Sequence, residues 1–464
     1  MVVKMIIEMP KQEAKARVNN FDEVNLGYNK EQAVKEASRC LQCSKPQCVA
    51  GCPVNIDIPK FIKYIKEGKA GRAIKVIKKT NNLPGVCGRV CPQEDQCEKL
   101  CILTAQKKPV AVGYLERYAS ENEESLEVPK IEKNGKKVAI VGSGPAGLTC
   151  AADLAVKGFK VVMLEALHKA GGVLTYGIPE FRLPKKIVEN EVKFIEELGV
   201  EIVPNSIVGQ LHSLDEMIGK FDAVFIGSGA GLPYFLKIPG ENLRNVYSAN
   251  EFLTRVNLMK AYKFPEYKTP IKRGGNVVVV GGGNVAMDAA RTARRLGSNV
   301  TIVYRRSFDE MPARREEIHH AKEEGIQFLL LTNPVRVVGK ENVSGVECVQ
   351  MMLGEPDESG RRRPVPIENS EFIVECDTFV VAIGQGPNPL ITKTSQLRHN
   401  AKGNLIVNEN LMTSKPGVFA GGDIVASGEN ATVIKAMGDG KLAAKSIEFW
   451  VKQEKLIKEE EVEE

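Results

Sequence analysis

The sequence predicts a chain of parallel α/β architecture preceded by a small helical domain whose core is partly inorganic. Eight of the 11 cysteines lie between Cys40 and Cys101, which sets the first ~130 residues apart from the rest. Beyond residue 135, short apolar segments alternate with glycine-rich turns and helical stretches, the pattern of parallel sheets. Two of those turns have the glycine spacing of dinucleotide-binding loops.

Length and composition limit the classes of protein to which the chain can belong. Its 464 residues suggest roughly three domains, and 43% hydrophobic with 26% charged residues is ordinary for a protein that buries a core. The formal charge of +6 does not indicate a nucleic-acid surface, although a modestly basic surface favours an acidic partner. No apolar run approaches the ~20 residues that span a bilayer, and Met1–Pro10 lacks a signal-peptide pattern. We therefore expect a cytoplasmic protein with no nucleic-acid or membrane partner.

The clustered cysteines indicate metal ligation, because cytoplasmic thiols stay reduced. They form two runs, Cys40-x2-Cys43-x4-Cys48-x3-Cys52-Pro53 and Cys87-x3-Cys91-Pro92-x5-Cys97-x3-Cys101. Short spacings and cysteine followed by proline are typical of iron–sulfur runs, although the middle gap is wider than in bacterial ferredoxins. Four thiolates also suit tetrahedral zinc. We favour iron–sulfur because the chain also carries two dinucleotide fingerprints, and spacing alone then assigns four cysteines to each of two 4Fe–4S clusters.

The remaining pattern places helices and strands. The segment Pro59–Lys79 has apolar residues at helical spacing, and the charged residues 122–135, which include Pro129, predict a linker. Predicted strands are Lys137–Val141, Lys160–Leu164, Ala223–Ile226, Asn276–Val280, Val300–Tyr304 and Thr378–Ile383. Three isolated cysteines lie in apolar segments and are expected in the core: Cys150, Cys348 and Cys376.

The first glycine fingerprint follows the strand Lys137–Val141 and opens a helix over Leu148–Val156. Its residues are Gly142, Ser143, Gly144, Pro145, Ala146 and Gly147. Glycines at those places allow a tight turn, close approach of the backbone to a pyrophosphate, and packing of helix on strand. The helix N-terminus offers N–H groups to the phosphates. Glu165 ends the next strand, where a carboxylate can accept hydrogen bonds from ribose hydroxyls.

A second fingerprint repeats this construction with alanine in the last place. Its residues are Gly281, Gly282, Gly283, Asn284, Val285 and Ala286. The strand that follows ends in Tyr304-Arg305-Arg306 instead of an acid. Guanidinium groups bind a 2′-phosphate that a carboxylate would repel, so this site predicts NADP(H) in preference to NAD(H). The alternatives are a purely structural turn at one fingerprint and a solvated basic surface at the two arginines.

The order of these motifs resembles the two-dinucleotide-binding flavoprotein fold, in which an FAD domain is split around an inserted NADPH domain. Near the end of the chain, Gly417–Asp423 adds a strand that runs into a Gly–Asp turn. In that fold, the turn, here Gly422 and Asp423, closes over the ribityl chain and pyrophosphate of FAD. The expected domains are an iron–sulfur domain over 1–130, an FAD domain over 131–250 and 385–464, and an NADPH domain over 251–384.

The whole chain also resembles the glutamate synthase small (beta) subunit family, which includes the large subunit of NADH-dependent reduced ferredoxin:NADP oxidoreductase. It is similar as well to the amino-terminal part of dihydropyrimidine dehydrogenase. The matching stretches cover all three domains and are Cys40–Pro53, Gly88–Pro92, Gly142–Gly147, Gly172–Pro184, Gly281–Arg291, Tyr304–Glu317 and Phe419–Asp423.

The resemblance changes the cluster ligands, because in this family the fourth cysteine of the first run crosses to the other cluster. One cluster would be held by Cys40, Cys43, Cys48 and Cys101. The other would be held by Cys52, Cys91, Cys97 and the non-cysteine ligand Glu116. Cys87 is then spare. Without the resemblance, Glu116 is expected to be a salt-bridge partner on a helix surface; as an oxygen ligand it would alter the potential of its cluster.

The resemblance also implies further cofactor-binding positions. Around FAD these are Gly172, Val173, Arg182, Val208 and the segment Asn430–Thr432, with Ala431 and Thr432. Around NADPH they are Arg314 and Gly384. The alternatives are a surface arginine for Arg182 and an ordinary helix N-cap for the segment before residue 433. We find no acid–base pair or nucleophile, because His319 and His320 lie on a charged helix and are expected to be solvated.

Together these features predict an NADPH-dependent oxidoreductase with FAD and two 4Fe–4S clusters. Hydride exchange between nicotinamide and flavin is the cofactors' own chemistry, and the protein supplies positions and electrostatics. The expected route runs from NADPH to FAD, to the cluster with Glu116, to the all-cysteine cluster and then to a partner, or in reverse.

Three hypotheses describe the partner. We favour the large subunit of a ferredoxin:NADP oxidoreductase, working with a second redox subunit or a ferredoxin-type protein, because Gly177–Pro184 looks closer to that branch. The alternative is the small subunit of glutamate synthase, which delivers electrons to a glutamate-forming large subunit; Met1-Val2 supplies no amino-terminal cysteine for glutamine hydrolysis. Two intact fingerprints argue against the third hypothesis, a non-catalytic scaffold.

Overall fold

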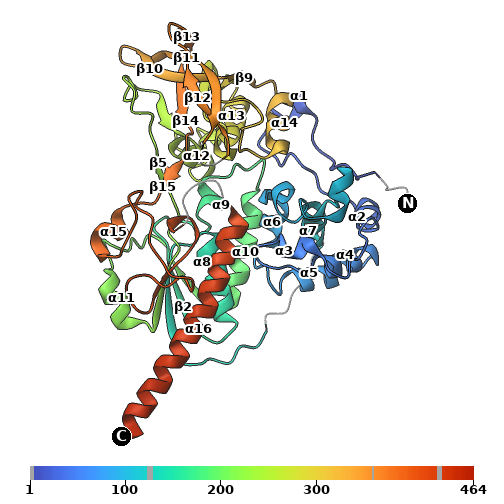
Figure 1. The fold of residues 1–464 in the computed structure, drawn as a ribbon, viewed down its shortest axis with the longest axis vertical. Helices are drawn as coiled ribbons and strands as arrows, with labels where there is room; N and C mark the ends of the chain where they lie inside the picture. The colour runs from blue at the N-terminus through green and yellow to red at the C-terminus, as the bar shows by residue number, and fades with distance from the viewer. Residues whose placement is uncertain (1–4, 123–128, 358–359, 426–430, 464) are drawn as a thin grey trace.

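The computed structural model describes residues 5–122, 129–357, 360–425 and 431–463, with side chains described up to residue 453. Figure 1 shows a group of short helices beside two α/β units, one of which carries the long C-terminal helix. The second α/β unit bears an antiparallel extension at the far end of the molecule. This arrangement matches the predicted fold class: a helical domain comes first in the chain, and an α/β domain that is split around a second, inserted α/β domain follows it.

Short helices joined by loops form the first domain. They are α1 (Ala14–Arg17), α2 (Lys30–Ala37), α3 (Gln47–Ala50), α4 (Ile58–Lys66), α5 (Ala70–Ile77), α6 (Pro84–Val90), η1 (Gln93–Asp95), η2 (Ile102–Gln106) and α7 (Val112–Glu121). The predicted helical segment 59–79 is confirmed as α4 and α5, which Gly68 separates with a φ of +73°. Apolar side chains at helical spacing, such as Phe61 and Ile74, are fully buried. The α4–α5 hairpin therefore buries one face and leaves its charged face outside.

Five parallel strands form the sheet of the first α/β unit, in the order β16-β4-β1-β2-β3. Their bounds are β1 (Lys137–Val141), β2 (Lys160–Leu164), β3 (Val200–Val203), β4 (Ala223–Ile226) and β16 (Val418–Ala420). Three helices pack around it, α8 (Pro145–Ala155), α10 (Lys185–Glu197) and α16 (Val433–Glu463). Because β16 comes from near the end of the chain, the chain leaves this unit and returns to complete its sheet.

The inserted unit has its own parallel sheet, in the order β6-β14-β7-β8-β9. The strands are β6 (Val246–Ser248), β7 (Asn276–Val280), β8 (Asn299–Tyr304), β9 (Gln327–Leu330) and β14 (Thr378–Val381). Its helices are α12 (Ala249–Asn257), α13 (Asn284–Arg295) and α14 (Arg315–Glu323). An antiparallel sheet that the sequence analysis did not predict extends from this unit, with β10 (Thr332–Gly339), β11 (Val343–Pro356), β12 (Arg362–Pro366) and β13 (Phe372–Glu375).

Short elements complete the chain. They are α9 (Val173–Tyr176), α11 (Leu214–Lys220), η3 (Ala261–Lys263), α15 (Leu390–Ser395), η4 (Gly422–Ile424), and the pair β5 (Leu232–Pro233) and β15 (Gln385–Gly386). Because β5 precedes and β15 follows the inserted unit, this antiparallel pair forms the connection between the two units. None of the described helices is both long and apolar enough to cross a membrane.

The structure agrees closely with the predicted strands. Four of the six have the predicted bounds, β8 begins one residue earlier, and β14 ends two residues before Ile383 as the chain approaches Gly384, whose φ is +113°. The predicted helix after the first fingerprint already begins at Pro145. The three isolated cysteines are buried in the core, as predicted: Cys150, Cys348 and Cys376. Residues 123–128 of the predicted linker lie outside the described residues.

Candidate redox cofactor sites

The first glycine turn joins β1 to α8 and leaves open space beside the start of the helix. Gly142 has a φ of +93°, and a Cβ there would lie 2.7 Å from the carbonyl oxygen of Gly227. A Cβ at Gly147 would lie 2.0 Å from the carbonyl oxygen of Gly142. At Gly144, by contrast, no described atom lies within 4 Å of such a Cβ, and no side chain caps α8. The turn therefore has uncapped N–H groups and room for a pyrophosphate, as a dinucleotide requires.

Glu165, at the end of β2, is hydrogen-bonded to this turn. Its Oε2 accepts from the backbone N–H of Ser143 at 2.9 Å and from the Ser143 hydroxyl at 2.5 Å, and its Oε1 accepts from the N–H of Leu167 at 2.8 Å. On another side of the turn, a Cβ at Gly172 would lie 2.9 Å from the Cα of Gly144. The structure thus brings Glu165, Gly172 and the fingerprint together, while their contacts with FAD stay predictions.

The Gly–Asp turn after β16 reaches the same place from the other end of the chain. Gly422 has a φ of +75°, and a Cβ there would lie 3.1 Å from the Cβ of Ala146 in the first fingerprint. The N–H of Gly422 donates to Asp439 Oδ2 on α16 at 2.8 Å. Burial raises the pKa of Asp423, and the nearby Asp439 raises it further. Two segments that are far apart in the sequence therefore form one site.

Two residues of this site were missed by the sequence analysis. Burial raises the pKa of Tyr176 to about 12, with added contributions from Asp423 and Glu165, so the phenol lies close to both halves of the site. Asp439 holds the Gly422 backbone. Tyr176 lies inside the Gly172–Pro184 stretch and could have been proposed from it. Asp439 has no local sequence signal, because only the fold brings α16 back to the turn.

The segment before α16 caps a helix. The Oγ1 of Thr432 accepts from the N–H of Lys435 at 3.3 Å, which is the N-cap alternative, while Ala431 is exposed. Asn430 lies outside the described residues. Val208 is buried and forms an isolated bridge with His212. Flavin contacts of Thr432, Ala431, Val208 and the α9 residue Val173 stay predictions.

The second glycine turn, between β7 and α13, repeats the geometry of the first. Gly281 has a φ of +138°, and a Cβ there would lie 2.2 Å from the carbonyl oxygen of Ala382. A Cβ at Gly282 would lie 2.6 Å from the ring of Tyr304, whereas at Gly283 no described atom lies within 4 Å. Gly283, like Gly144 in the first turn, thus faces open space beside an uncapped helix start. This turn therefore also fits a nucleotide pyrophosphate.

The two arginines after β8 have different surroundings. Arg306 is buried; its Nη2 donates to Asp357 at 2.6 Å and its Nε donates to the carbonyl oxygen of Arg362 at 2.7 Å. Arg305 is exposed and forms no ion pair with any described residue, and partial burial and the charge of Arg306 lower its pKa. Of the pair, Arg305 therefore has a guanidinium that is available to a 2′-phosphate, close to the charge of Arg361.

Several other predicted nucleotide residues have partners within the protein. Arg182 is not the surface arginine of the alternative hypothesis, because its side chain is buried and donates to both carboxylate oxygens of Asp288 on α13 at 2.6–2.7 Å. Arg314 is buried, and its Nη2 donates to Gln93 Oε1 of the first domain at 3.0 Å. The N–H of Arg314 donates to Asn284 Oδ1 at 2.9 Å, and Val285 is partly exposed. Nucleotide binding by these residues, and by Gly384, stays a prediction.

Four cysteines form an outer group near the surface of the first domain. Burial raises the pKa of Cys48 to about 11, with contributions from Cys101, Cys40 and Cys43. Burial also raises the pKa of Cys40, and Cys101 and Cys43 add to it. Cys43 is exposed, while the other three are half-buried. The group is the set that the family resemblance assigns to one cluster.

An inner group of cysteines is buried. Burial raises the pKa of Cys52 to about 12, and Glu116 and Cys91 add to it. Burial likewise raises the pKa of Cys97, with contributions from Glu98, Cys52, Cys91 and Glu116. The structure therefore brings Cys52, Cys91, Cys97 and Glu116 into one neighbourhood, apart from the outer group, and Cys87 shares this neighbourhood beside Cys91 and Glu116. No three His, Cys, Asp or Glu side chains in the described part of the chain are arranged to hold a single metal ion.

Glu116 is not the exposed salt-bridge partner of the alternative hypothesis. Its side chain is buried, it forms no ion pair with any described residue, and its Oε1 accepts from Asn81 Nδ2 at 2.6 Å. Burial raises the pKa of Glu116 to about 8, against the effect of the Asn81 hydrogen bond. An unpaired buried carboxyl is costly unless something else binds it, which fits a cluster ligand. Ligation itself stays a prediction.

The start of α16 connects the Gly–Asp turn with the inner cysteines. Met437 Sδ lies 3.5 Å from the Sγ of the spare Cys87, whose Sγ also lies 3.7 Å from Asn81 Oδ1. One residue later, a Cβ at Gly438 would lie 3.1 Å from the carbonyl oxygen of Pro53, which follows Cys52. Asp439, next along the helix, holds the turn at Gly422. Within one helical turn, α16 thus contacts both candidate cofactor sites.

Comparisons with known proteins agree with this geometry. Residues 17–128 match the family described as dihydropyrimidine dehydrogenase domain II, 4Fe-4S cluster, and residues 136–440 match the pyridine nucleotide-disulphide oxidoreductase family. The small chain of NADPH glutamate synthase from Halomonas elongata is 37% identical over 448 residues, which cover 94% of each chain. The chain belongs to the glutamate synthase small-chain family. It is also 39% identical to the NADP(+)-dependent formate dehydrogenase subunit beta of Moorella thermoacetica, over 88% of this chain and 60% of that protein.

The two family matches resolve two alternatives that the sequence left open. The first domain belongs to a 4Fe–4S family, so iron–sulfur is correct and zinc is not. The rest is an oxidoreductase module, so the scaffold hypothesis is not supported. Among solved structures, FprA of Mycobacterium tuberculosis in complex with NADPH has a TM-score of 0.59 at 22% identity, covering 69% of this chain and 85% of that one. This likeness supports the predicted two-dinucleotide fold.

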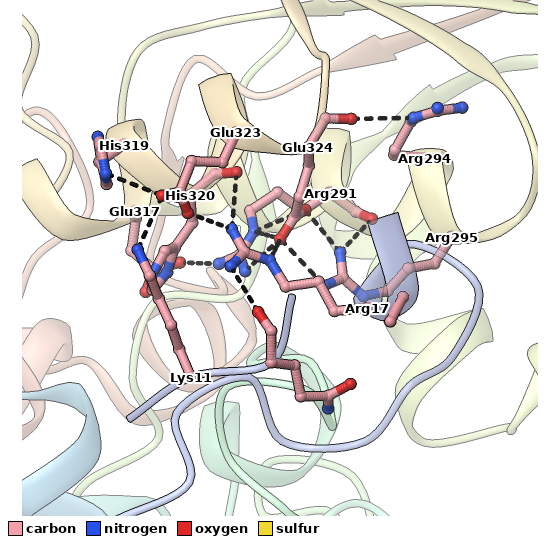
Figure 2. Close-up of polar contacts among 12 residues, drawn as sticks. Lys11, Arg17, Arg291, Arg294, Arg295, Glu317, His319, His320, Glu323 and Glu324 are labelled. Carbon is pink, nitrogen blue, oxygen red and sulfur yellow. Dashed lines mark hydrogen bonds and ion pairs between the residues drawn. The ribbon is translucent and has the colours of Figure 1, made fainter. Parts of the chain in front are cut away.

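In this member of the family, a buried charged junction ties the first domain to the inserted unit (Figure 2). Arg17 is fully buried; its Nε donates to Glu324 Oε1 and its Nη2 to Glu323 Oε2, both at 2.8 Å. Glu324 also accepts from Arg291 and Arg295 of α13, and the Arg295 guanidinium lies 3.8 Å from the centre of the Phe181 ring.

His320 belongs to this junction, and its predicted exposure is wrong. Only 3% of its surface is accessible, because α14 turns this face of the helix toward α13 and the N-terminal segment. Burial, together with Arg291, lowers the pKa of His320 to about 4. The prediction failed because the surrounding charges looked like a solvated surface, whereas they pair with one another. His319 is exposed, as predicted.

Proposed function

We propose that this chain is an NADPH-dependent oxidoreductase that binds FAD and two 4Fe–4S clusters and passes single electrons to a partner protein. The observation that carries the proposal is the second turn of α16, whose residues contact both the flavin-side turn and the residues around the inner cysteines. A hydride carrier and a one-electron carrier that share one helix can exchange electrons over a short path.

We assign each cofactor to its own residues. FAD would be held by the first fingerprint, Glu165, and the Gly422–Asp423 turn. NADPH would be held by the second fingerprint and Arg305. When bound, the flavin accepts a hydride from nicotinamide and releases electrons singly. The protein's part is to keep the two open glycine turns aligned and to exclude water from the sites.

The burial of the cysteines supports an order for the two clusters. The inner group lies on the side of the first domain that contacts α16. Its residues Cys52, Cys91 and Cys97 are buried, whereas Cys43 of the outer group is exposed. We therefore place the Cys52, Cys91, Cys97 and Glu116 cluster next to the flavin, and the Cys40, Cys43, Cys48 and Cys101 cluster next to the partner. Glu116 supports this assignment because its buried carboxyl lacks any cationic partner in the described residues.

The partner separates two versions of the proposal. We favour the large subunit of a ferredoxin:NADP oxidoreductase, on the strength of the Gly177–Pro184 stretch. The small chain of NADPH glutamate synthase is the second candidate, because a relative of that name aligns with 94% of this chain and over 94% of its own length. Relatives named as small chains or beta subunits support the expectation that this chain also works as a subunit.

Reduction of the purified holoenzyme by nicotinamides tests the proposal. With NADPH in a stopped-flow instrument, we expect the flavin absorbance to bleach first and the cluster absorbance to follow. With NADH, bleaching should be at least ~10-fold slower, and Arg305→Ser should reduce this difference, because a charged hydrogen bond contributes ~1.5–3 kcal/mol. A flavin that NADPH does not bleach, or clusters that stay oxidised behind a bleached flavin, would refute the proposal.

Copurification from the native source distinguishes the two partners. A second flavin or iron–sulfur subunit bound to the chain supports the ferredoxin-linked version. A large glutamate-forming subunit supports the glutamate synthase version and refutes the first.

A further inference from the structure

The formal charge of the molecule is concentrated in one small region. Residues 57–82, which comprise α4, α5 and their flanks, contain eight lysines and arginines and only two acids, so this segment alone carries a charge equal to the whole formal charge of +6. The remaining residues are balanced. We call this segment the basic hairpin.

The basic side chains of the hairpin are turned to solvent. Six of them are exposed and form no ion pair or side-chain hydrogen bond with any described residue, namely Lys60, Lys63, Lys66, Arg72, Lys75 and Lys79. Lys69 pairs with Glu67, and both are solvent-accessible. Uncompensated charge on two adjacent helices repels itself and weakens folding slightly. Its presence is explained more readily by binding than by stability.

The hairpin lies directly beside the outer cysteine group. Gln42, between Cys40 and Cys43, donates from Nε2 to the carbonyl oxygen of Pro59 in the first turn of α4 at 2.9 Å. The same Nε2 lies 3.4 Å from the Sγ of Cys40. In Figure 1, α4 lies at the edge of its domain that is remote from α8 and α16. The positive field is therefore centred next to the cysteines that are most accessible from outside.

Apolar side chains surround the same cysteines. Leu41 is 50% exposed, and Leu100 and Ile102, which flank Cys101, are 43% and 64% exposed. Exposed apolar residues are ordinary when scattered, but here three large ones border one redox group. An apolar centre with a charged rim is the usual composition of a specific protein interface.

We infer that the basic hairpin and the apolar residues Leu41, Leu100 and Ile102 form the docking surface for an acidic one-electron carrier protein. This inference rests on the proposed function, since it names the kind of partner that the outer cluster serves. The lysines attract and orient an acidic carrier, and the apolar centre brings its redox group close to the outer cysteines. A neutral or basic partner would gain nothing from the hairpin.

A charge-reversal experiment on the loaded holoenzyme tests the inference. The test variant is Lys60→Glu, Lys63→Glu, Lys75→Glu. The matched control is Lys340→Glu, Lys393→Glu, Lys402→Glu, which changes the net charge equally on exposed lysines of the two α/β units that form no ion pair with a described residue. Association with an immobilised acidic 2[4Fe–4S] ferredoxin is followed by interferometry at several salt concentrations.

We expect the hairpin variant to lower the association rate constant at least ~10-fold at low salt, because steering by local charge changes on-rates by ~10 to 1,000-fold. The difference should shrink toward 0.15 M salt, where the screening length is about 8 Å. Ile102→Ser should instead raise the dissociation rate. Equal slowing in both triple variants would overturn the inference, as would ferredoxin association that does not depend on salt.

A second readout keeps this inference separate from the proposed function. Bleaching of flavin and clusters by NADPH, without ferredoxin, should be the same in the wild type and the hairpin variant. Normal bleaching with unchanged ferredoxin association would refute the docking surface alone. Binding of the holoenzyme to vesicles of anionic phospholipid through the same lysines, with no association to ferredoxin, would also overturn it.

Discussion

The iron–sulfur domain makes two contacts of different chemistry with its neighbours. Toward the FAD-type unit, α16 makes a close and uncharged contact, here called the soft contact: Met437 lies against Cys87, and Gly438 lies against Pro53. Beside it, Asn82 donates to Asp153 and the N–H of Gly85 donates to Glu191. Toward the inserted unit, Arg17, Arg291 and Glu324 form a buried ionic junction (Figure 2). At the soft contact the two residues from α16 are uncharged, and Gly438 places no side chain between the two candidate redox sites. The second is rich in directional bonds.

This difference indicates a division of labour. Electron exchange needs proximity, and a glycine at the contact lets the two sites approach. An ionic junction contributes orientation, because each carboxylate accepts only from guanidinium groups in fitting positions. Buried ion pairs add little net stability compared with apolar packing, but removing one partner is costly. We therefore expect the two contacts to respond differently to substitution.

The largest effect is expected for Glu324→Gln. Glu324 accepts from Arg17, Arg291 and Arg295, all buried. Arg291 and Arg295 hold its pKa well below the ordinary value in spite of burial. Removing its charge takes a counter-ion from three buried guanidinium groups, of which Arg17 keeps Glu323 and Arg291 keeps Glu317, and we expect a cost of about 3–5 kcal/mol. Urea unfolding measures the change.

Glu341→Gln is the matched control, since its only described partner, Arg244, lies 3.6 Å away and both side chains are more than three-quarters exposed. We expect no more than about 0.5 kcal/mol there. If both substitutions cost the same, the junction is not the cooperative unit that the structure indicates.

Acid should weaken the ionic junction in two stages. Burial and Arg291 lower the pKa of His320 from 6.5 to about 4. Between these two pH values, His320 is protonated in the unfolded chain but neutral in the folded chain. Stability that is present above pH 6.5 is therefore lost as the pH falls toward 4. The cations Arg182 and Arg291 lower the pKa of Glu317 to about 2 in spite of burial, so its contribution is lost between about pH 4.5 and 2. A tenfold difference in proton affinity between the folded and unfolded chain corresponds to about 1.4 kcal/mol of stability.

Unfolding curves from pH 7 to 3 measure this loss, and His320→Gln should flatten the upper stage only. Glu316, Glu317 and Arg17 also face His320, and they remain in that variant. An upper stage that persists without the imidazole would show that another group titrates there.

The sequence predicts the features that depend on local spacing, but not those that depend on contacts between distant segments. Both fingerprints, the strand bounds and the inner and outer cysteines follow local spacing or family motifs, because a pyrophosphate turn needs glycines at fixed places. Asp439, Tyr176 and the buried state of His320 depend on helices that return from far along the chain, and no local pattern encodes them. The antiparallel strands β10–β13 were missed because glycines and prolines interrupt β11 and β12, including Gly345, Gly354 and Pro364.

The packing of α16 against the first fingerprint, next to the soft contact, should be sensitive to volume. A Cβ at Gly440 would lie 2.4 Å from the carbonyl oxygen of Ala146, so Gly440→Val forces α16 away from the first fingerprint. Overpacking of this kind costs about 1–3 kcal/mol, and we expect the variant to lose flavin during gel filtration. Gly219→Val is the control, because no described atom lies within 4 Å of a Cβ there and the residue is exposed. Equal flavin retention in both would contradict the proposed position of α16 beside the cofactor.

The smallest effect is expected for Cys87→Ala, which separates packing from ligation at the soft contact. Cys87 is fully buried between Asn81 and Met437, so its loss removes one sulfur contact and costs roughly 1 kcal/mol. Because the proposed inner ligands are Cys52, Cys91, Cys97 and Glu116, iron and sulfide content should stay unchanged. Cys91→Ala, four residues away on the same segment, should lose about half of both. Iron loss in the Cys87 variant with retention in the Cys91 variant would reverse the two roles, and Asn81 would then orient a ligand thiolate instead of the Glu116 carboxyl.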